Sequence, residues 1–346
     1  MDQTILVTGA TGYLGAWAVK NLLEKGYNVR ITVRDKSKNE KYAFLEEFAA
    51  SSTGNLSVFE ADLLKPESFD DAAKGSDAIF HIASPFTLRF KNPLEDLIKP
   101  AVEGTKNVLN AATNSGTVKK VILTSSVAAV HGDNIDMREK GLSEFTEDDF
   151  NDSSSENHQP YSYSKVTAEL AAWDIAKKQQ DWQLVVVNPS FIMGPPLSAS
   201  SNSESIQFMK DLLSGKMLMG APALEFGFVD VRDVADAHIL AFENNDSEGR
   251  HILAERVMNV MELSSIIKKL YPGKYLLPKM QSPKFMLYLI GWAFGLSGKF
   301  ISRNVGHHIK LNNSKSKRAL GVSYTPMEST IKDMVEKMKD LHLIKS

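Results

Sequence analysis

Short apolar runs alternate with longer helix-like stretches over the first 190 residues of this 346-residue chain, and this alternation constrains the fold more than any other feature. In the longer stretches, at 14–25, 100–114 and 164–179, apolar residues recur at spacings of three and four, as on one helix face. The expected strands are 5–8, 29–33, 56–60, 78–82, 121–124 and 184–188. Strands that alternate with helices form parallel βαβ units, so the pattern predicts an α/β fold with a doubly wound parallel sheet.

A glycine-rich turn, Gly9-Ala10-Thr11-Gly12-Tyr13-Leu14-Gly15, follows the first expected strand and opens the first expected helix. Gly9 allows the tight turn, Gly12 lets the backbone approach a pyrophosphate, and Gly15 lets the helix pack closely on the strand. The helix N-terminus presents free amide groups and a positive dipole end to the phosphates. The motif therefore predicts a dinucleotide site in a Rossmann sheet.

The alternation weakens after Pro189, where Gly194-Pro195-Pro196 and a Ser/Asn cluster predict a long loop or boundary. We expect residues 1–190 to form the dinucleotide-binding domain, with 227–255 returning to it. Residues 191–226 and 256–346 are then a smaller substrate-binding region, mostly C-terminal. The polar segment 141–160 is predicted to be an exposed excursion.

The tip of the second expected strand, 32–35, carries Arg34 where an NAD-selective site places a carboxylate. A guanidinium suits the 2'-phosphate of NADPH through charge-assisted hydrogen bonds, and three nearby lysines add positive charge. The sequence therefore predicts NADPH in preference to NADH. The alternative is a solvated charged loop in which Asp35 binds the ribose. Asp62, after the third strand, is predicted to accept a hydrogen bond from the adenine amino group.

Tyr161 and Lys165 lie four residues apart, so a helix places both on one face. Reduction of a carbonyl by hydride needs a proton donor at the developing alkoxide, and a phenol with a pKa near ~10 is a weak donor at neutral pH. A nearby ammonium favours the phenolate, so we expect Lys165 to lower the pKa of Tyr161 and to hold the nicotinamide ribose. Tyr163 has Thr167 four residues on and is the weaker candidate.

Two serines, Ser125 and Ser126, end the strand expected at 121–124. Ligands of open α/β folds bind at this carboxyl edge of the sheet, where a hydroxyl can hold a substrate carbonyl. Serines at strand ends usually cap the next turn. The presence of Tyr161 and Lys165 favours a catalytic Ser126.

Together these motifs resemble those of an extended short-chain dehydrogenase/reductase. The resemblance rests on residues 8–15, Arg34, 124–126, 161–165 and 188–190. Segments 80–86 and 98–105 make the chain similar to the dihydroflavonol 4-reductase group, with cinnamoyl-CoA reductases and methylglyoxal reductases. The similarity covers nearly the whole chain and is stronger before Pro196 than after it.

The resemblance implies an NADPH-dependent oxidoreductase that reduces a ketone or aldehyde and needs no metal. Ser126 would orient the carbonyl, Tyr161 donate the proton, and Lys165 bind ribose and tune the tyrosine. Glu103 replaces an asparagine that completes a tetrad in many relatives, so no proton relay is expected there. The predicted cofactor-binding residues are Gly9, Thr11, Gly12, Tyr13, Leu14, Gly15, Arg34, Lys41, Asp62, Leu63, Ala83, Ser84, Thr124, Ser125, Tyr161, Lys165, Pro189 and Ile192.

Apolar residues near this site predict the substrate class. The residues expected to line the pocket are Phe86, Leu88 and Phe90 on one side and Phe191, Met193 and Phe226 on the other. Such a lining suits aryl or alkyl carbonyls, such as dihydroflavonol-like compounds, diketones or keto esters. Arg89 argues against this interpretation, since a cation there could anchor a carboxylate or phosphate.

Two other function classes remain open. A nucleotide-sugar epimerase or dehydratase would share the fold and the Tyr/Lys pair, but dehydratases carry an Asp-Glu pair where this chain has Val127 and Ala128. A dinucleotide sensor without catalysis would keep the fold and lose the tyrosine, which is present here.

The composition limits which binding partners and which cellular compartment we expect for the protein. Cysteine is absent, which excludes disulfides and thiolate metal sites, and the histidines lack metal-ligand spacing. The net charge of -2 gives no field for nucleic acid or an anionic membrane, and no secretion signal opens the chain. We expect a cytoplasmic monomer or homodimer with a small-molecule carbonyl substrate and no nucleic-acid or membrane partner. The apolar run 285–296 is too short to span a membrane and favours a buried helix over a membrane-surface segment.

Overall fold

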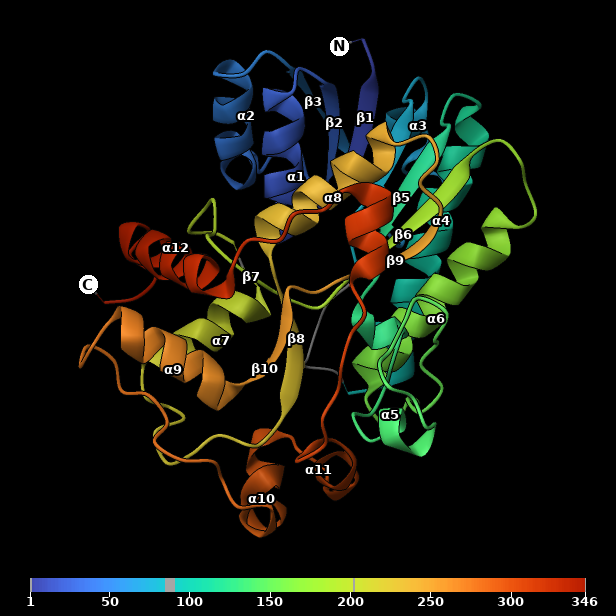
Figure 1. Ribbon diagram of the computed structural model, residues 1–346. Helices are drawn as coiled ribbons and strands as arrows, with labels where there is room; N and C mark the ends of the chain where they lie inside the picture. The colour runs from blue at the N-terminus through green and yellow to red at the C-terminus, as the bar shows by residue number, and fades with distance from the viewer. Residues whose placement is uncertain (1, 85–90, 202, 346) are drawn as a thin grey trace.

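The computed structural model describes residues 2–84, 91–201 and 203–345. Within these ranges the large sheet has seven parallel strands in the order β3-β2-β1-β4-β5-β6-β9 (Figure 1). The strands are β1 (Thr4–Thr8), β2 (Asn28–Val33), β3 (Asn55–Glu60), β4 (Ala78–His81), β5 (Lys120–Thr124), β6 (Gln183–Pro189) and β9 (Gly249–Leu253). The order changes direction between β1 and β4, as in a doubly wound sheet, so the predicted fold class is confirmed.

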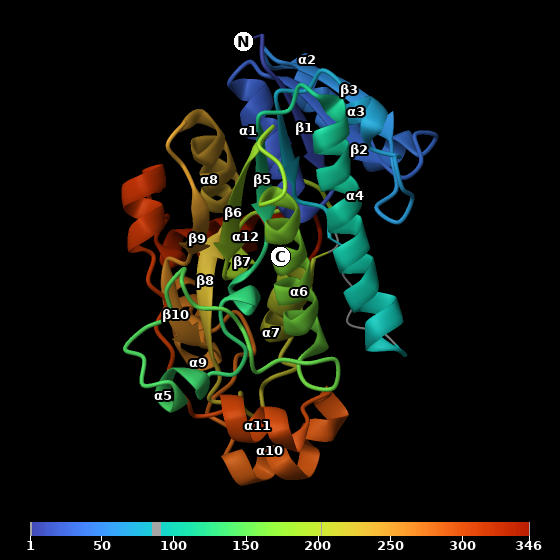
Figure 2. The ribbon, with the colours of Figure 1, turned by 90° about the vertical axis from the view of Figure 1, so that its right-hand side faces the viewer.

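Helices cover both faces of the large sheet (Figures 1 and 2). α1 (Tyr13–Glu24) and α8 (Val231–Glu243) pack together on one face, and α4 (Lys99–Ser115) and α6 (Pro160–Ala176) pack together on the other. Side chains alternate along a strand, so Ile5 and Val7 face the first pair while Leu6 faces the second. Burial on both faces explains why the strands are continuous apolar runs.

A smaller sheet follows the large one, in the order β10-β8-β7. Its strands are β7 (Phe191–Met193), β8 (Glu225–Asp230) and β10 (Arg256–Asn259), and its helices are α7 (Glu204–Leu213), α9 (Val260–Leu270) and α12 (Met327–Asp340). α12 buries the stripe Ile331, Met334, Val335 and Met338 in the same core as α1 and α8. β8 belongs to this sheet, so the chain returns to the large sheet at α8 and not at residue 227.

Segment 141–160 is not the exposed excursion that its composition predicts. Phe145 and His158 are buried, and the Phe145 backbone pairs with Lys310 and Asn312. The His158 ring lies 2.9 Å from the Asp133 carboxylate. Contacts with chain more than 100 residues away thus anchor a segment that is locally polar.

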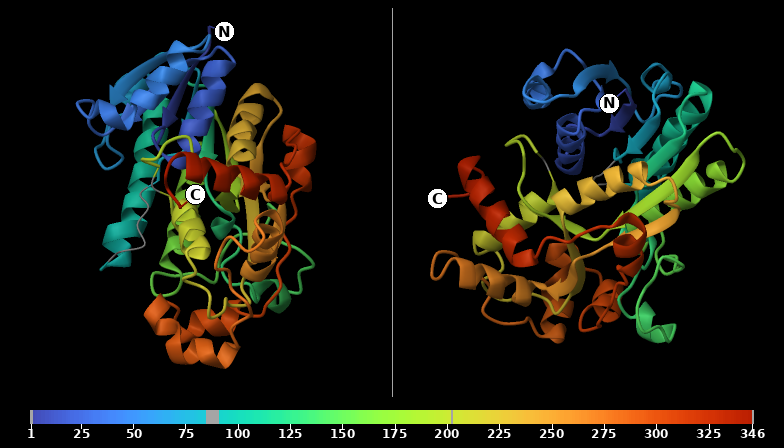
Figure 3. Two further views of the ribbon diagram at one scale, coloured as in Figure 1. Left: turned by 90° about the vertical axis from the view of Figure 1, so that its left-hand side faces the viewer. Right: turned by 45° about the horizontal axis from the view of Figure 1, so that its top comes forward.

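Segment 285–296 is also placed differently from its prediction. It forms α10 (Lys284–Ile290) and a short 3-10 helix (Gly291–Phe294), beside α11 (Gly298–Asn304). α10 and α11 lie at the end of the molecule far from the large sheet (Figures 1 and 3). Among α10 side chains, Leu287 is buried but Phe285 is 70% exposed, so the prediction of a buried helix is wrong. No helix in the described part of the chain is long and apolar enough to cross a membrane.

Candidate active site

The glycine-rich turn joins β1 to α1 and leaves no room for a side chain at Gly9 or Gly15. Gly9 has a φ of 71°, and a Cβ on it would lie 2.8 Å from the backbone of Ala83. A Cβ on Gly15 would lie 2.1 Å from the Gly9 carbonyl oxygen. Gly12 precedes α1 in extended conformation, so the first N–H groups of the helix have no intrahelical acceptor. The turn therefore has the shape and donors that a pyrophosphate needs.

Neighbouring residues hold this turn in place. The Tyr13 hydroxyl donates to the Gly194 carbonyl at 2.5 Å, which ties α1 to the loop after β7. Thr8 Oγ1 accepts from the Ala83 N–H at 3.1 Å and lies 2.9 Å from the His81 ring. Burial lowers the pKa of His81 to about 3, so this histidine is neutral and packs inside the sheet.

The charged residues after β2 distinguish the two hypotheses for the adenosine ribose. Asp35 accepts from the Ser37 N–H and hydroxyl, and the Lys38 ammonium lies 3.2 Å away. The hydrogen bonds from Ser37 and Lys38 lower the pKa of Asp35 and commit its carboxylate to this turn. Arg34 and Lys41 are exposed, and within the described ranges neither forms an ion pair. Arg34 and Lys41 are therefore available to an anion, whereas the Asp35 carboxylate is already bonded within its own turn.

The loop after β3 is tied to α4. Asp62 accepts from the Leu64 N–H at 2.9 Å, and the Leu63 carbonyl accepts from Asn107 at 2.8 Å. Leu63 lies against Gly104, where a Cβ would be 3.1 Å away. Glu103, one position earlier on α4, pairs with Lys106 on the surface, so it does not reach the catalytic candidates.

Tyr161 lies in the first turn of α6. The helix begins at Pro160 and not at residue 164, because proline is well suited to the first helical position. Tyr161 forms a hydrogen bond with the Ser126 side chain, whose Oγ also accepts from the Ala128 N–H at 3.1 Å. The structure therefore brings the end of β5 and the start of α6 together at these two hydroxyls.

Lys165 lies one turn further along α6 and points to the end of β4. Its Nζ donates to Ser84 Oγ at 3.0 Å and lies 5.7 Å from the centre of the Tyr161 ring. A small cavity of about 20 Å³ separates these elements. Its lining residues are His81, Ala83, Ser84, Thr105, Leu123, Thr124, Ser125, Lys165, Ala168 and Glu169.

The pKa of Tyr161 is shifted in the opposite direction from the prediction. Burial raises it to about 12, and the hydrogen bond with Ser126 offsets only part of that shift. Burial also lowers the pKa of Lys165 to about 8. Desolvation disfavours the charged form of both groups, and the ammonium bonds to Ser84 instead of the phenol oxygen.

These shifts predict which group limits activity at high pH. Lys165 loses its proton at about pH 8, whereas Tyr161 keeps its proton up to about pH 12. We expect kcat/KM for NADPH, which reports the free enzyme, to be level below about pH 8 and to fall above it by about tenfold per pH unit. Lys165→Arg, which stays charged, should move the fall to higher pH. An unchanged profile in that variant would contradict the assignment to Lys165.

Glu169 is a site residue that the sequence did not predict. Its buried carboxylate accepts from Ser125 Oγ at 2.5 Å, from Asn188 Nδ2 at 2.8 Å and from Arg250 Nε at 2.6 Å. Asn188 also donates to the Ser126 carbonyl at 3.1 Å. Glu169 follows Lys165 by four residues, and this spacing was the available signal. The carboxylate holds both serines of the strand end, while Arg250 balances its charge.

The remaining predicted cofactor residues lie along the same edge of the sheets. Thr124 Oγ1 is 2.7 Å from His238 of α8. Pro189 is the last residue of β6, the strand next to β5, and Ile192 lies in β7, which follows β6.

The apolar pocket is only partly described. Phe86, Leu88, Phe90 and Arg89 lie outside the described residues. Phe191 and Phe226 face each other with ring centres 6.5 Å apart, and Phe226 is 38% exposed. Met193 is fully buried in the main core. Two of the six expected lining residues are thus placed at an accessible surface.

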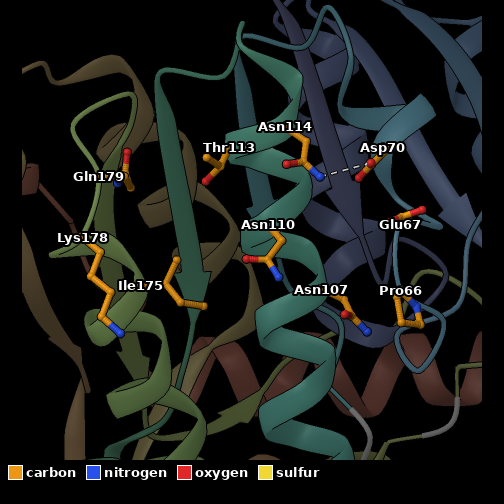
Figure 4. Close-up of a pocket in the computed structure, with 10 residues that line it drawn as sticks. All are labelled: Pro66, Glu67, Asp70, Asn107, Asn110, Thr113, Asn114, Ile175, Lys178 and Gln179. Carbon is orange, nitrogen blue, oxygen red and sulfur yellow. Dashed lines mark hydrogen bonds between the residues drawn. The ribbon is translucent and has the colours of Figure 1, made fainter.

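A larger groove of about 490 Å³ lies elsewhere, between α3 (Asp70–Ala73), α4 and the end of α6 (Figure 4). Most of its lining residues are polar, and Asn114 donates to Asp70 within it. α4 and α6 end where β5 and β6 begin, so this groove lies toward the amino ends of the strands. It contains none of the predicted catalytic or cofactor residues, and ligands of such sheets bind at the opposite edge.

Known proteins resemble the chain along most of its length. A sequence model described as the NAD dependent epimerase/dehydratase family matches residues 5–259. Cinnamoyl-CoA reductase CAD2 of Medicago truncatula is 35% identical over 343 residues, which cover 98% of this chain and 97% of that protein. Dihydroflavonol 4-reductase of Gerbera hybrida is 33% identical over 273 residues, covering 79% and 74%.

A solved structure agrees with these matches. The structure of Gre2 from Candida albicans in complex with NADPH superimposes with a TM-score of 0.78 and 30% identity, covering 98% of this chain and 99% of that one. A UDP-glucuronic acid complex of MoeE5, at 19% identity and a TM-score of 0.71, shares the fold alone. The glycine turn, the strand-end serines and the Tyr/Lys helix agree with these matches: the chain belongs to the NAD dependent epimerase/dehydratase family of extended short-chain dehydrogenases/reductases, in the dihydroflavonol 4-reductase-like group.

Proposed function

We propose that the chain is an NADPH-dependent reductase that transfers hydride to the carbonyl carbon of a ketone or aldehyde. The observation that carries this proposal is the convergence of Ser126, Tyr161 and Lys165 at the carboxyl edge of the sheet, beside the glycine turn. Relatives named as reductases, and a neighbour solved with NADPH, support the same chemistry.

The residues present fit NADPH. The backbone N–H groups at the start of α1 suit the pyrophosphate, and Arg34 with Lys41 suits the 2'-phosphate. Ser84 and Lys165 suit the nicotinamide ribose, since they meet at the end of β4. Residues 1–190 with α8 and β9 would hold the cofactor, and the smaller sheet with its helices would hold the substrate. When bound, NADPH supplies a hydride from its nicotinamide ring.

The side chains near the substrate carbonyl would orient it and supply the proton. The hydroxyls of Ser126 and Tyr161, already in hydrogen-bond contact, can both donate to a carbonyl oxygen and orient it. Tyr161 is fully protonated at neutral pH, so it can transfer its proton to the alkoxide as negative charge develops there. The Lys165 ammonium stabilises the phenolate left behind. Glu169 holds the end of β5 in position through its hydrogen bonds with Ser125 and Asn188.

The proposed substrates are aryl or alkyl carbonyls. Phe191 and Phe226 offer aromatic faces beside the catalytic edge, and apolar contact favours substrates with a hydrophobic substituent. The named relatives act on cinnamoyl-CoA, a thioester with a phenyl substituent, and on dihydroflavonols, which are aryl ketones.

A substrate panel tests the proposal. Aldehydes, diketones, α-keto esters, dihydroflavonols and UDP-glucose are incubated with NADPH, and loss of its absorbance is compared with alcohol formed. We expect one alcohol per NADPH consumed and no turnover of the nucleotide sugar. If UDP-glucose reacts fastest, or product forms without net loss of NADPH, the chain is an epimerase or dehydratase. If Arg89→Ala abolishes activity with every neutral carbonyl, the apolar substrate class is wrong.

A further inference from the structure

An apolar stripe covers the outer side of α10 and the turn that follows it. Phe285, Tyr288, Leu289 and Trp292 are spaced by three, one and three residues, so they share one helical face. Their side chains are 70%, 49%, 68% and 78% exposed. Isolated exposed apolar residues are common, but a continuous stripe with an exposed tryptophan marks an interaction surface.

The opposite side of α10 fixes the stripe in its outward orientation. Leu287 is buried with Ile301 of α11 and with Val305, the residue after α11, in a separate small core. Gly291 lies so close to Ile301 that a Cβ there would be 2.9 Å away. The helix therefore cannot turn its stripe inward without losing this packing.

The sequence around the stripe carries an excess of positive charge. Between Glu262 and Glu328 the chain has eleven Lys or Arg residues and no Asp or Glu, although the whole chain has a net charge of -2. Arg303 and Lys310 pair with acidic residues of other segments. Lys279 and Lys299, six residues before and seven after the stripe, are exposed and have no acidic partner within the described ranges.

We propose that this stripe is a docking surface for an anionic phospholipid membrane, on which the protein lies without spanning it. Aromatic and leucine side chains beside lysines are the composition of interfacial helices, because the apolar groups enter the headgroup boundary while the ammonium groups meet lipid phosphates. Tryptophan and tyrosine suit that boundary, since each has an apolar ring and a polar atom.

The position of the stripe at one end of the molecule is consistent with binding to a flat membrane surface. α10 and α11 form one end of the molecule, away from the large sheet (Figures 1 and 2). The sequence predicts no membrane partner for two reasons: the net charge of -2 gives no attractive field, and segment 285–296 is predicted to be buried. The exposure of the stripe removes the second reason.

Sedimentation with vesicles tests the proposal. The full chain is mixed with vesicles of phosphatidylcholine alone, or of phosphatidylcholine and phosphatidylserine in equal parts, at low and high salt. We expect binding to the anionic vesicles that weakens at high salt. Leu289→Ser with Trp292→Ser should lower the bound fraction by at least about tenfold. Lys279→Glu with Lys299→Glu should do the same at low salt.

A matched control is Leu170→Ser, which removes a leucine that is 44% exposed on α6 and should leave vesicle binding unchanged. NADPH binding by each variant checks that it folds. If the unmodified chain binds neither vesicle, or binds both equally, the proposal is wrong. If it binds no vesicle and the Leu289/Trp292 variant instead converts a dimer to a monomer in ultracentrifugation, the stripe joins two copies of the chain.

Discussion

Replacing Tyr161 by phenylalanine is expected to lower the rate of carbonyl reduction by about 100- to 10,000-fold, the usual contribution of a positioned general acid. The substitution removes only the hydroxyl that contacts Ser126, and the ring keeps its packing. NADPH binding, measured by fluorescence titration, should therefore be retained. The stopped-flow rate of NADPH oxidation at saturating substrate gives the size of the effect.

Tyr163→Phe is the matched control, because Tyr163 lies two residues further along the same helix, with Thr167 and not a cation one turn on. That variant should keep turnover close to that of the unmodified chain. Retention of most activity in Tyr161→Phe, or an equal loss in both variants, would refute Tyr161 as the proton donor.

Arg34→Ala is expected to weaken NADPH binding by roughly 10- to 150-fold while hardly changing NADH binding. The range corresponds to the loss of one charge-assisted hydrogen bond, on the order of 1.5 to 3 kcal/mol. Calorimetric titration with each cofactor measures the two dissociation constants. NADH lacks the 2'-phosphate and so serves as the internal control.

Lys38→Ala provides a second comparison for the same site. Lys38 pairs with Asp35 and is already committed to the turn, so its loss should change NADPH affinity much less than loss of Arg34. Equal weakening of NADPH and NADH by Arg34→Ala would show that Arg34 does not contact the 2'-phosphate.

Features set by short-range geometry could be predicted from the sequence. The alternation of apolar runs and helical stretches predicts the sheet because each strand is buried on both faces by its neighbouring helices. The spacing of Gly9 and Gly15 predicts the turn because a Cβ at either position would meet nearby backbone. Tyr161 and Lys165 could be paired because one helical turn separates them, although the start of α6 at Pro160 was missed.

Features that depend on contacts between distant parts of the chain could not be predicted from the sequence. Glu169 meets Arg250 and Ser125 across different elements, so no local pattern shows that network. The pKa of Tyr161 rises because burial, which a spacing rule does not contain, outweighs the hydrogen bond with Ser126. Whether an apolar helix is buried depends on what packs against it. α10 meets α11 on one side alone, and its apolar stripe therefore remains exposed.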